Sequence, residues 1–294
     1  MSIRDQGYQR YTGTRTAAAA RWTVVLRATL RQTLRQPWVV AILIISIFPA
    51  LIGGVVMYFA AKVYAQVPAE QLAQMGVQDP GSYVFLFQVR WYGTPILCFL
   101  MAMFAGAGTV ADDIRMNAFQ FYFARPLSRE QYYLGKLLPA ILLVFFVAFL
   151  PPFLLAAVRI AIAKDGGDVL RQSLLVIRAL GLATLEAIAM AVPAVAMSSI
   201  SSRKGLVQGG YAALFMLPWV MGAIVGAILR SPWPNIAALP ALLEAVGGEM
   251  YGYKFEAGER VLPWLPSLIV IVLVCSASAV LLRRRLASVE VVQG

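Results

Sequence analysis

The sequence predicts an all-α protein that crosses a membrane six times, and three observations support this prediction. Hydrophobic residues make up 60% of the 294 residues and charged residues only 13%, against about 45–50% and about 25% in a typical soluble domain. The apolar residues stand in long blocks and not at the spacing of amphipathic helices or strands. Six blocks approach or exceed the length of about 20 residues that a helix needs to cross a bilayer.

Each of the six blocks predicts one spanning helix. The first is the clearest, because Trp38 to Phe59 contains no charged residue. The fourth is the weakest, because Arg178 and Glu186 fall within it. The chain therefore divides into an N-terminal segment (1–36), a six-span domain (37–283) and a tail (284–294). The six blocks cover residues 38–61, 91–111, 134–158, 174–198, 206–229 and 263–282.

The charge and the scarcity of metal-binding residues exclude several function classes. A net charge of +11 is typical of nucleic-acid-binding proteins, but basic residues also collect in the cytoplasmic loops of membrane proteins. We favour the second reading and expect a lipid bilayer, and no nucleic acid, as partner. With no histidine, and with Cys98 and Cys275 as the two cysteines, the chain holds neither a Cys/His metal site nor a histidine-based catalytic triad. We therefore expect no catalytic residue and no metal.

The basic residues also predict an orientation. Sixteen of the 25 fall in the N-terminal segment, the second–third loop, the fourth–fifth loop and the tail, which six spans place on one side. Because lysine and arginine favour the cytoplasmic side, we expect a multi-pass protein of a bacterial cytoplasmic (inner) membrane with both termini in the cytoplasm. The third–fourth loop, with Arg159, Lys164 and Arg171, fits this orientation least well.

Residues 21–35 predict a basic amphipathic helix lying in the membrane interface. At about 100° per residue, one face carries Trp22, Val25, Leu26, Thr29, Leu30 and Thr33. The other face carries Arg21, Arg27, Arg31 and Arg35. Such a helix places its arginines near anionic headgroups, and it serves either as an anchor that sets the topology or as a mechanical element.

The fifth–sixth loop, residues 230–262, is rich in proline and contains the apolar run Ala237 to Val246. Ten residues cannot cross the bilayer, but they can form a re-entrant or interfacial helix pair. A simple external loop with a buried turn is the alternative.

The second–third loop carries the most specific pattern. Asp112 and Asp113 end the second span, and an apolar-aromatic stretch follows. Arg125 stands before Pro126 and therefore avoids the helical region, while Ser128 and the glutamine three residues later form a capping box that starts a new helix. We expect a short helix over residues 114–124 whose aromatic side chains form a partner surface. A belt of these aromatics in the membrane interface is the alternative.

This loop resembles the type 2 ABC transporter permease family. The family pattern has acids after the second span, a short cytoplasmic helix, then Arg-Pro-[small apolar]-Ser-Arg, and Gly-Lys at the mouth of the third span. The resemblance covers the layout of the whole chain and, at residue level, about residues 112–136. The matching residues are Asp112, Asp113, Arg125, Pro126, Leu127, Ser128, Arg129, Gly135 and Lys136.

The resemblance implies a permease subunit of an ATP-driven exporter, coupled to a separate ABC ATPase. Two permeases, either two copies of this chain or one copy and a paralogue, would join two ATPases. ATP and Mg would be held by the ATPase, because this chain contains no Gly-x-x-x-x-Gly-Lys-[Ser/Thr] loop, so the chain itself would not be an enzyme. The residues implied in coupling are Asp112, Asp113, Arg115, Phe119, Phe121, Tyr122, Arg125, Pro126, Ser128 and Arg129.

Two other functions remain open at this stage. A secondary transporter or channel would need no ATPase partner and would use polar groups within the membrane, for which Arg178 and Glu186 are the candidates. An intramembrane enzyme is disfavoured, because acids are scarce inside the spans and histidine is absent. Since a carboxylate at bilayer depth costs roughly 2.5–3.5 kcal/mol, we expect Glu186 to face protein or a water-filled cavity.

Overall fold

The computed structural model describes residues 17, 20–64, 84–90, 94–123, 127–163, 165–256 and 258–287, and within them every regular element is a helix. Six helical segments are long and apolar enough to cross a membrane, which confirms the predicted number and fits a multi-pass membrane protein. They are α2 (Pro37–Tyr64), α5 (Thr94–Ala105) continued by α6 (Thr109–Arg115), α8 (Arg129–Ala161), α9 (Gly166–Ser198), α10 (Lys204–Leu229) and α12 (Trp264–Ala287).

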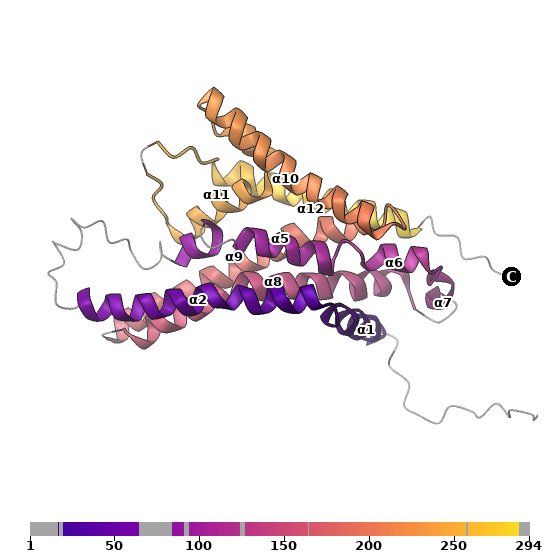
Figure 1. The fold of residues 1–294 in the computed structure, drawn as a ribbon, viewed down its shortest axis with the longest axis horizontal. Coiled ribbons are helices and arrows are strands. Elements are labelled where there is room, and N and C mark those ends of the chain that lie inside the picture. Colours follow the sequence, from indigo (N-terminus) through magenta and orange to yellow (C-terminus); the bar gives the residue numbers. More distant parts are fainter. Residues whose placement is uncertain are drawn as a thin grey trace, which may run out of the picture.

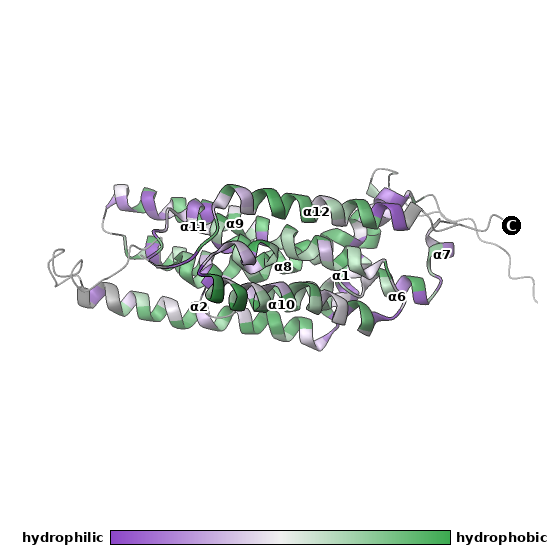
Figure 2. Cartoon of the chain, turned by 90° about the horizontal axis from the view of Figure 1, so that it is seen from above, coloured by the Kyte–Doolittle hydropathy of each residue, from purple (hydrophilic) through white to green (hydrophobic). Residues whose placement is uncertain are grey.

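Successive spans run in alternate directions, so the loops gather alternately at the two ends of the bundle (Figure 1). We call one the basic end: it carries α1 (Trp22–Leu34), α6, α7 (Phe119–Phe123) and the exposed Arg115, Arg129, Arg203 and Arg283. The opposite end carries η2 (Leu86–Arg90), η3 (Trp233–Ala237) and α11 (Leu239–Tyr251). Figure 2 shows that the long helices are mostly hydrophobic and that hydrophilic residues gather towards the ends.

The centre of the bundle is the pair α8 and α9, which pack against each other along their length. Small side chains four residues apart give α9 a smooth buried stripe, which lets helix backbones approach closely. Both helices have 33 residues, or about 50 Å at 1.5 Å per residue, so they exceed the hydrocarbon thickness of about 30 Å. The stripe consists of Ala179, Ala183, Ala187 and Ala191, each 0% exposed.

Helix α8 begins at the capping box that the sequence predicts. Ser128 Oγ accepts a hydrogen bond from the Gln131 amide at 3.2 Å, and Gln131 Oε1 accepts one from the Ser128 amide at 3.2 Å. The helix therefore starts five residues before its apolar block. Further along, Pro151 and Pro152 are both buried inside the helix, where neither can donate a backbone hydrogen bond.

Helix α1 has the two faces that its sequence predicts. Val25, Thr29 and Thr33 are buried, while Arg27, Arg31 and Arg35 are exposed; Trp22, on the same face as Val25, is half-buried. The apolar face packs against α8, where Gly135 provides the space. A Cβ atom at that position would stand 2.5 Å from the Val25 Cβ and 3.1 Å from the Trp22 carbonyl oxygen.

At the opposite end, the fifth–sixth loop forms two helices: η3 over its proline-rich part and α11 over most of the apolar run. Helix α11 packs against α9 and α12, and its Leu242 and Leu243 are each 1% exposed. The run is therefore part of the core of the chain and not a loose external loop.

Candidate functional site

The acid-rich loop at the basic end contains two short helices, and the expected single helix over 114–124 is wrong. Asn117 has φ 51°, a left-handed conformation that asparagine adopts more readily than most residues. The Asn117 amide donates to the Ile114 carbonyl at 3.2 Å, and the Ala118 amide donates to the Asp113 carbonyl at 2.9 Å. This pair of bonds is the Schellman helix ending, so α6 stops and α7 starts in a new direction.

The turn between α6 and α7 separates the aromatic residues. Phe119 is only 7% exposed and packs edge-on against Tyr132 of α8, with ring centroids 5.4 Å apart. Tyr122 also packs against Tyr132, at 5.2 Å, and its pKa is raised by burial and by the charge of Asp113. Phe121, in contrast, is 74% exposed. The side chain of Phe123 and residues 125–126, the predicted Arg125–Pro126 break, lie outside the described residues.

The exposed part of this loop forms a small surface that we call the α6–α7 surface. It combines one aromatic, one aliphatic thioether, one charged and two amide side chains. Its members are Arg115, Met116, Asn117, Gln120 and Phe121.

Asp113 faces the interior of its own chain and not a partner. Its Oδ2 lies 2.7 Å from Lys136 Nζ, with the two side chains 7% and 4% exposed. The same oxygen accepts a hydrogen bond from Tyr132 Oη at 2.6 Å. Lys136 also donates to the Thr109 carbonyl at 3.3 Å. The expected orienting role of Asp113 towards a partner is therefore corrected: the acid fastens α6 to α8.

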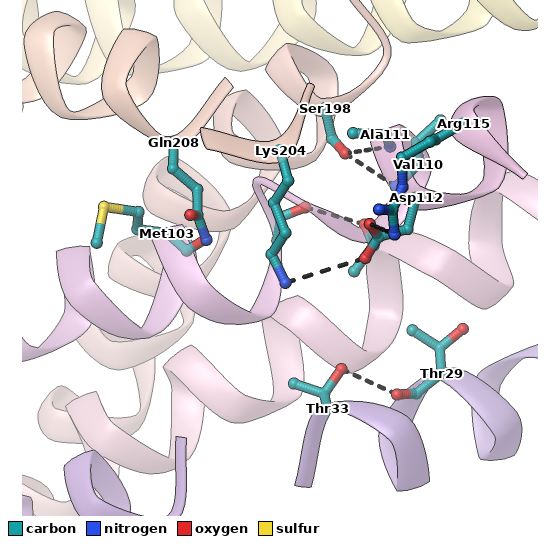
Figure 3. Close-up of polar contacts among 12 residues, drawn as sticks. Thr29, Thr33, Met103, Val110, Ala111, Asp112, Arg115, Ser198, Lys204 and Gln208 are labelled. Carbon is teal, nitrogen blue, oxygen red and sulfur yellow. Dashed lines mark hydrogen bonds and ion pairs between the residues drawn. The ribbon is translucent and has the colours of Figure 1, made fainter. Parts of the chain in front are cut away.

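Asp112 is more accessible and faces α10. Figure 3 shows its carboxylate between Lys204 and Arg115, at 3.9 Å from Lys204 Nζ and 3.3 Å from Arg115 Nη2. In the same view the Ser198 hydroxyl, at the end of α9, accepts hydrogen bonds from the amides of Val110 and Ala111 at 2.8 and 2.9 Å. Contacts of Asp112, Asp113 and the first turn of α6 thus join α6 to α8, α9 and α10.

Three residues of this cluster were not anticipated from the sequence: Tyr132, Ser198 and Lys204. A weak signal existed, because two acids at the end of an apolar block need cationic partners when buried. The lysines near the basic end are Lys136, in the first turns of α8, and Lys204, the first residue of α10, and both pair with these acids.

A second polar cluster lies inside the bundle around Glu186, which is 2% exposed. The prediction that Glu186 faces protein is therefore confirmed. Gln88 of η2 donates to Glu186 Oε2 at 3.4 Å and accepts a hydrogen bond from Tyr251 Oη at 2.8 Å. Arg178 does not reach Glu186 and donates instead to the Tyr251 carbonyl at 3.0 Å. The cluster connects α9 to η2 and α11.

Gln88 was also not predicted as a site residue. It lies in an apolar stretch before the second span that is too short to predict a spanning helix. At its end, Arg90 holds two acids of the fifth–sixth loop: its Nε lies 2.6 Å from Glu244 Oε1 and its Nη1 lies 2.6 Å from Glu259 Oε1. Burial raises the pKa of Glu244, and the Arg90 charge opposes that rise. These ion pairs fasten η2 to α11 at the opposite end.

No protein-family model matches the chain, and no curated protein is significantly similar to it. The function of the chain is therefore inferred from its residues and their geometry.

Proposed function

We propose that the chain is the membrane-spanning permease subunit of an ATP-driven ABC exporter, working as one of a pair of permeases and driven by separate ATPase subunits that hold ATP and Mg. The coarse support is the set of six spanning helices, which fits a membrane transport protein. In this proposal the basic end is cytoplasmic, as expected from the preference of arginine and lysine for that side.

The observation that carries the proposal is the rigid presentation of the α6–α7 surface. Asp113, Lys136 and Tyr132 fix α6 to α8, and Phe119 and Tyr122 fix α7 to the same helix. Phe121 is left exposed by that packing. An exposed aromatic on a fixed support is the type of anchor that dominates binding energy once a partner desolvates it.

This arrangement changes which residues we assign to ATPase binding. Phe121, Met116 and Arg115 enter the partner cleft, and Arg129 lies at its edge. Asp113, Phe119, Tyr122 and Ser128 act through the stiffness of the connection to α8, and Asp112 acts through the connection to α10. A displacement of the α6–α7 surface then moves the spans as well, because buried side-chain contacts hold α6 and α7 against α8.

A photo-crosslinking amino acid at position 121, placed in the full chain in its native membranes, tests the proposal. We expect crosslinks to a protein that binds ATP through a phosphate-binding loop, identified by mass spectrometry. The control is position 170, where Leu170 is 67% exposed near the start of α9 at the opposite end. Equal capture of the ATPase from both positions, or no ATPase from position 121, would contradict the proposal.

A secondary transporter that works without an ATPase is the second candidate, and the Gln88–Glu186–Tyr251 cluster is the observation that favours it. Buried carboxylates within membrane spans often mark proton or substrate paths. The substitution Glu186→Gln keeps the side-chain shape and removes the carboxylate. Lost transport with unchanged assembly supports substrate or proton handling, whereas lost assembly assigns Glu186 to the fold.

A further inference from the structure

A groove opens between the first turns of α8 and the last turns of α12 at the basic end. Its cavity volume is about 510 Å³. The wall consists of Tyr133 and Leu134 from α8 and Ala279 and Val280 from α12. Leu134 is 39% and Val280 50% exposed, so the apolar floor is open to the surroundings.

The groove exists because α8 and α12 both pack against α9 and make little contact with each other. Helix α12 also packs against α11. Beside α9, the space between the two helices is left unfilled by any other described part of the chain. In the proposed bilayer this open side faces lipid, at the depth where a hydrocarbon chain meets the headgroups.

The mouth of the groove is basic. Arg283 Nη2 and Glu130 Oε1 form an ion pair of 2.6 Å across it, with side chains 79% and 71% exposed. Arg129, the first residue of α8, also lines the groove, so two arginines and one acid surround its mouth. Guanidinium groups bind phosphate through paired hydrogen bonds, and each arginine near a membrane surface strengthens the attraction to anionic lipid.

We propose that this groove binds one anionic phospholipid, with the upper part of an acyl chain against Leu134 and Val280 and the phosphate between Arg129 and Arg283. Tyr133 lies in the wall beside them, and tyrosine favours the level of the headgroups. A second copy of the chain fits the groove less well. A two-fold axis there would bring the same patch against itself and would set the arginine clusters against one another.

The test uses the delipidated full-length chain in detergent, with melting temperature and native mass spectrometry as readouts. We expect phosphatidylglycerol to raise the melting temperature and to remain bound as one molecule per chain. Phosphatidylcholine is expected to bind more weakly, and sodium phosphate is expected to have no effect. Stabilisation by phosphate alone, or equal binding of the two lipids, would overturn the proposal.

Two variants locate the site. Arg129→Gln with Arg283→Gln should weaken phosphatidylglycerol binding by about tenfold. Ala279→Trp should fill the groove and prevent retention of the lipid with every arginine still present. The matched control is Arg171→Gln with Arg230→Gln, which makes the same charge change at two exposed arginines of the opposite end. If the control weakens binding as much as the groove variants, the site lies elsewhere. A groove variant that changes the oligomeric state but not lipid binding would assign the groove to a second copy.

Discussion

Lys136 and Asp113 lie 2.7 Å apart between Nζ and Oδ2, and each side chain is more than nine-tenths buried. The pair joins α8 to the end of the second span, with Tyr132 as a further donor to the same carboxylate. Burying two charges is costly, so the pair contributes mainly by fixing how α6 lies on α8. Removing one partner leaves the other charge buried without compensation.

Lys136→Met should therefore destabilise the chain by about 3–5 kcal/mol, the cost typical of a broken buried ion pair. The double variant Lys136→Met with Asp113→Leu should recover most of that loss, because no buried charge remains. Unfolding by denaturant in micelles measures both. Lys254→Met, at an exposed lysine of the opposite end, is the control. A double variant as unstable as the single one would show that the ion pair is not the cause.

The two phenylalanines of α7 should respond differently to truncation. Phe119→Ala removes a buried ring and should cost about 3–5 kcal/mol of stability. Phe121→Ala removes a ring that is 74% exposed and should leave the unfolding transition unchanged while it weakens ATPase binding. Thermal unfolding and ATPase co-purification separate the two effects. Normal ATPase binding by Phe121→Ala would remove the main aromatic anchor from the proposal.

The contact of α1 with α8 depends on the missing side chain at Gly135. The substitution Gly135→Ala places a methyl group 2.5 Å from Val25 Cβ, so α1 should move away from α8. The measurement uses a background in which Cys98 and Cys275 are replaced by serine and Thr29, only 4% exposed, is replaced by cysteine. In this background Gly135→Ala should make maleimide labelling of position 29 several-fold faster. Gly209→Ala is the matched control, because a Cβ there meets nothing within 4 Å. Equal labelling in both variants would mean that α1 does not rely on this close approach.

The two ends of the bundle should lie on opposite sides of the membrane. Single cysteines replacing Ser202, at the basic end, and the exposed Glu256, at the opposite end, report on this in the same cysteine-free background. In intact cells an impermeant maleimide should label position 256 and leave position 202 unlabelled until the membrane is opened. Labelling of position 202 from outside would reverse the proposed orientation.

The elements that follow from local rules could be predicted from the sequence. Long apolar blocks give the six spans, and the spacing of Ser128 and Gln131 gives the start of α8, because capping depends on neighbours in the chain. The two faces of α1 follow from the helical period for the same reason. The helix ends were predicted less well. Helices α8 and α9 begin five and eight residues before their apolar blocks, 134–158 and 174–198.

The features that depend on three-dimensional packing could not be predicted. Whether Phe119 or Phe121 faces outward is decided by the left-handed turn at Asn117 and by the position of Tyr132. The pairing of Asp112 with Lys204 joins residues 92 positions apart. Gln88 could be recognised only from its partners in α9 and α11, because a single glutamine in a short apolar stretch does not reveal which groups it binds.

The adjacent prolines of α8 have a mechanical consequence. Two neighbouring residues, Pro151 and Pro152, cannot donate to the carbonyls one turn earlier, so the helix is weakest against bending just before them. The joint separates a stem, residues 129–150, from a shorter tip, residues 151–161. The stem carries the contacts to α6, α7 and α1, while the tip lies against α2 near Gly54. The helix can therefore bend at this joint when the stem tilts, and the opposite end of the bundle can keep its position while the basic end moves.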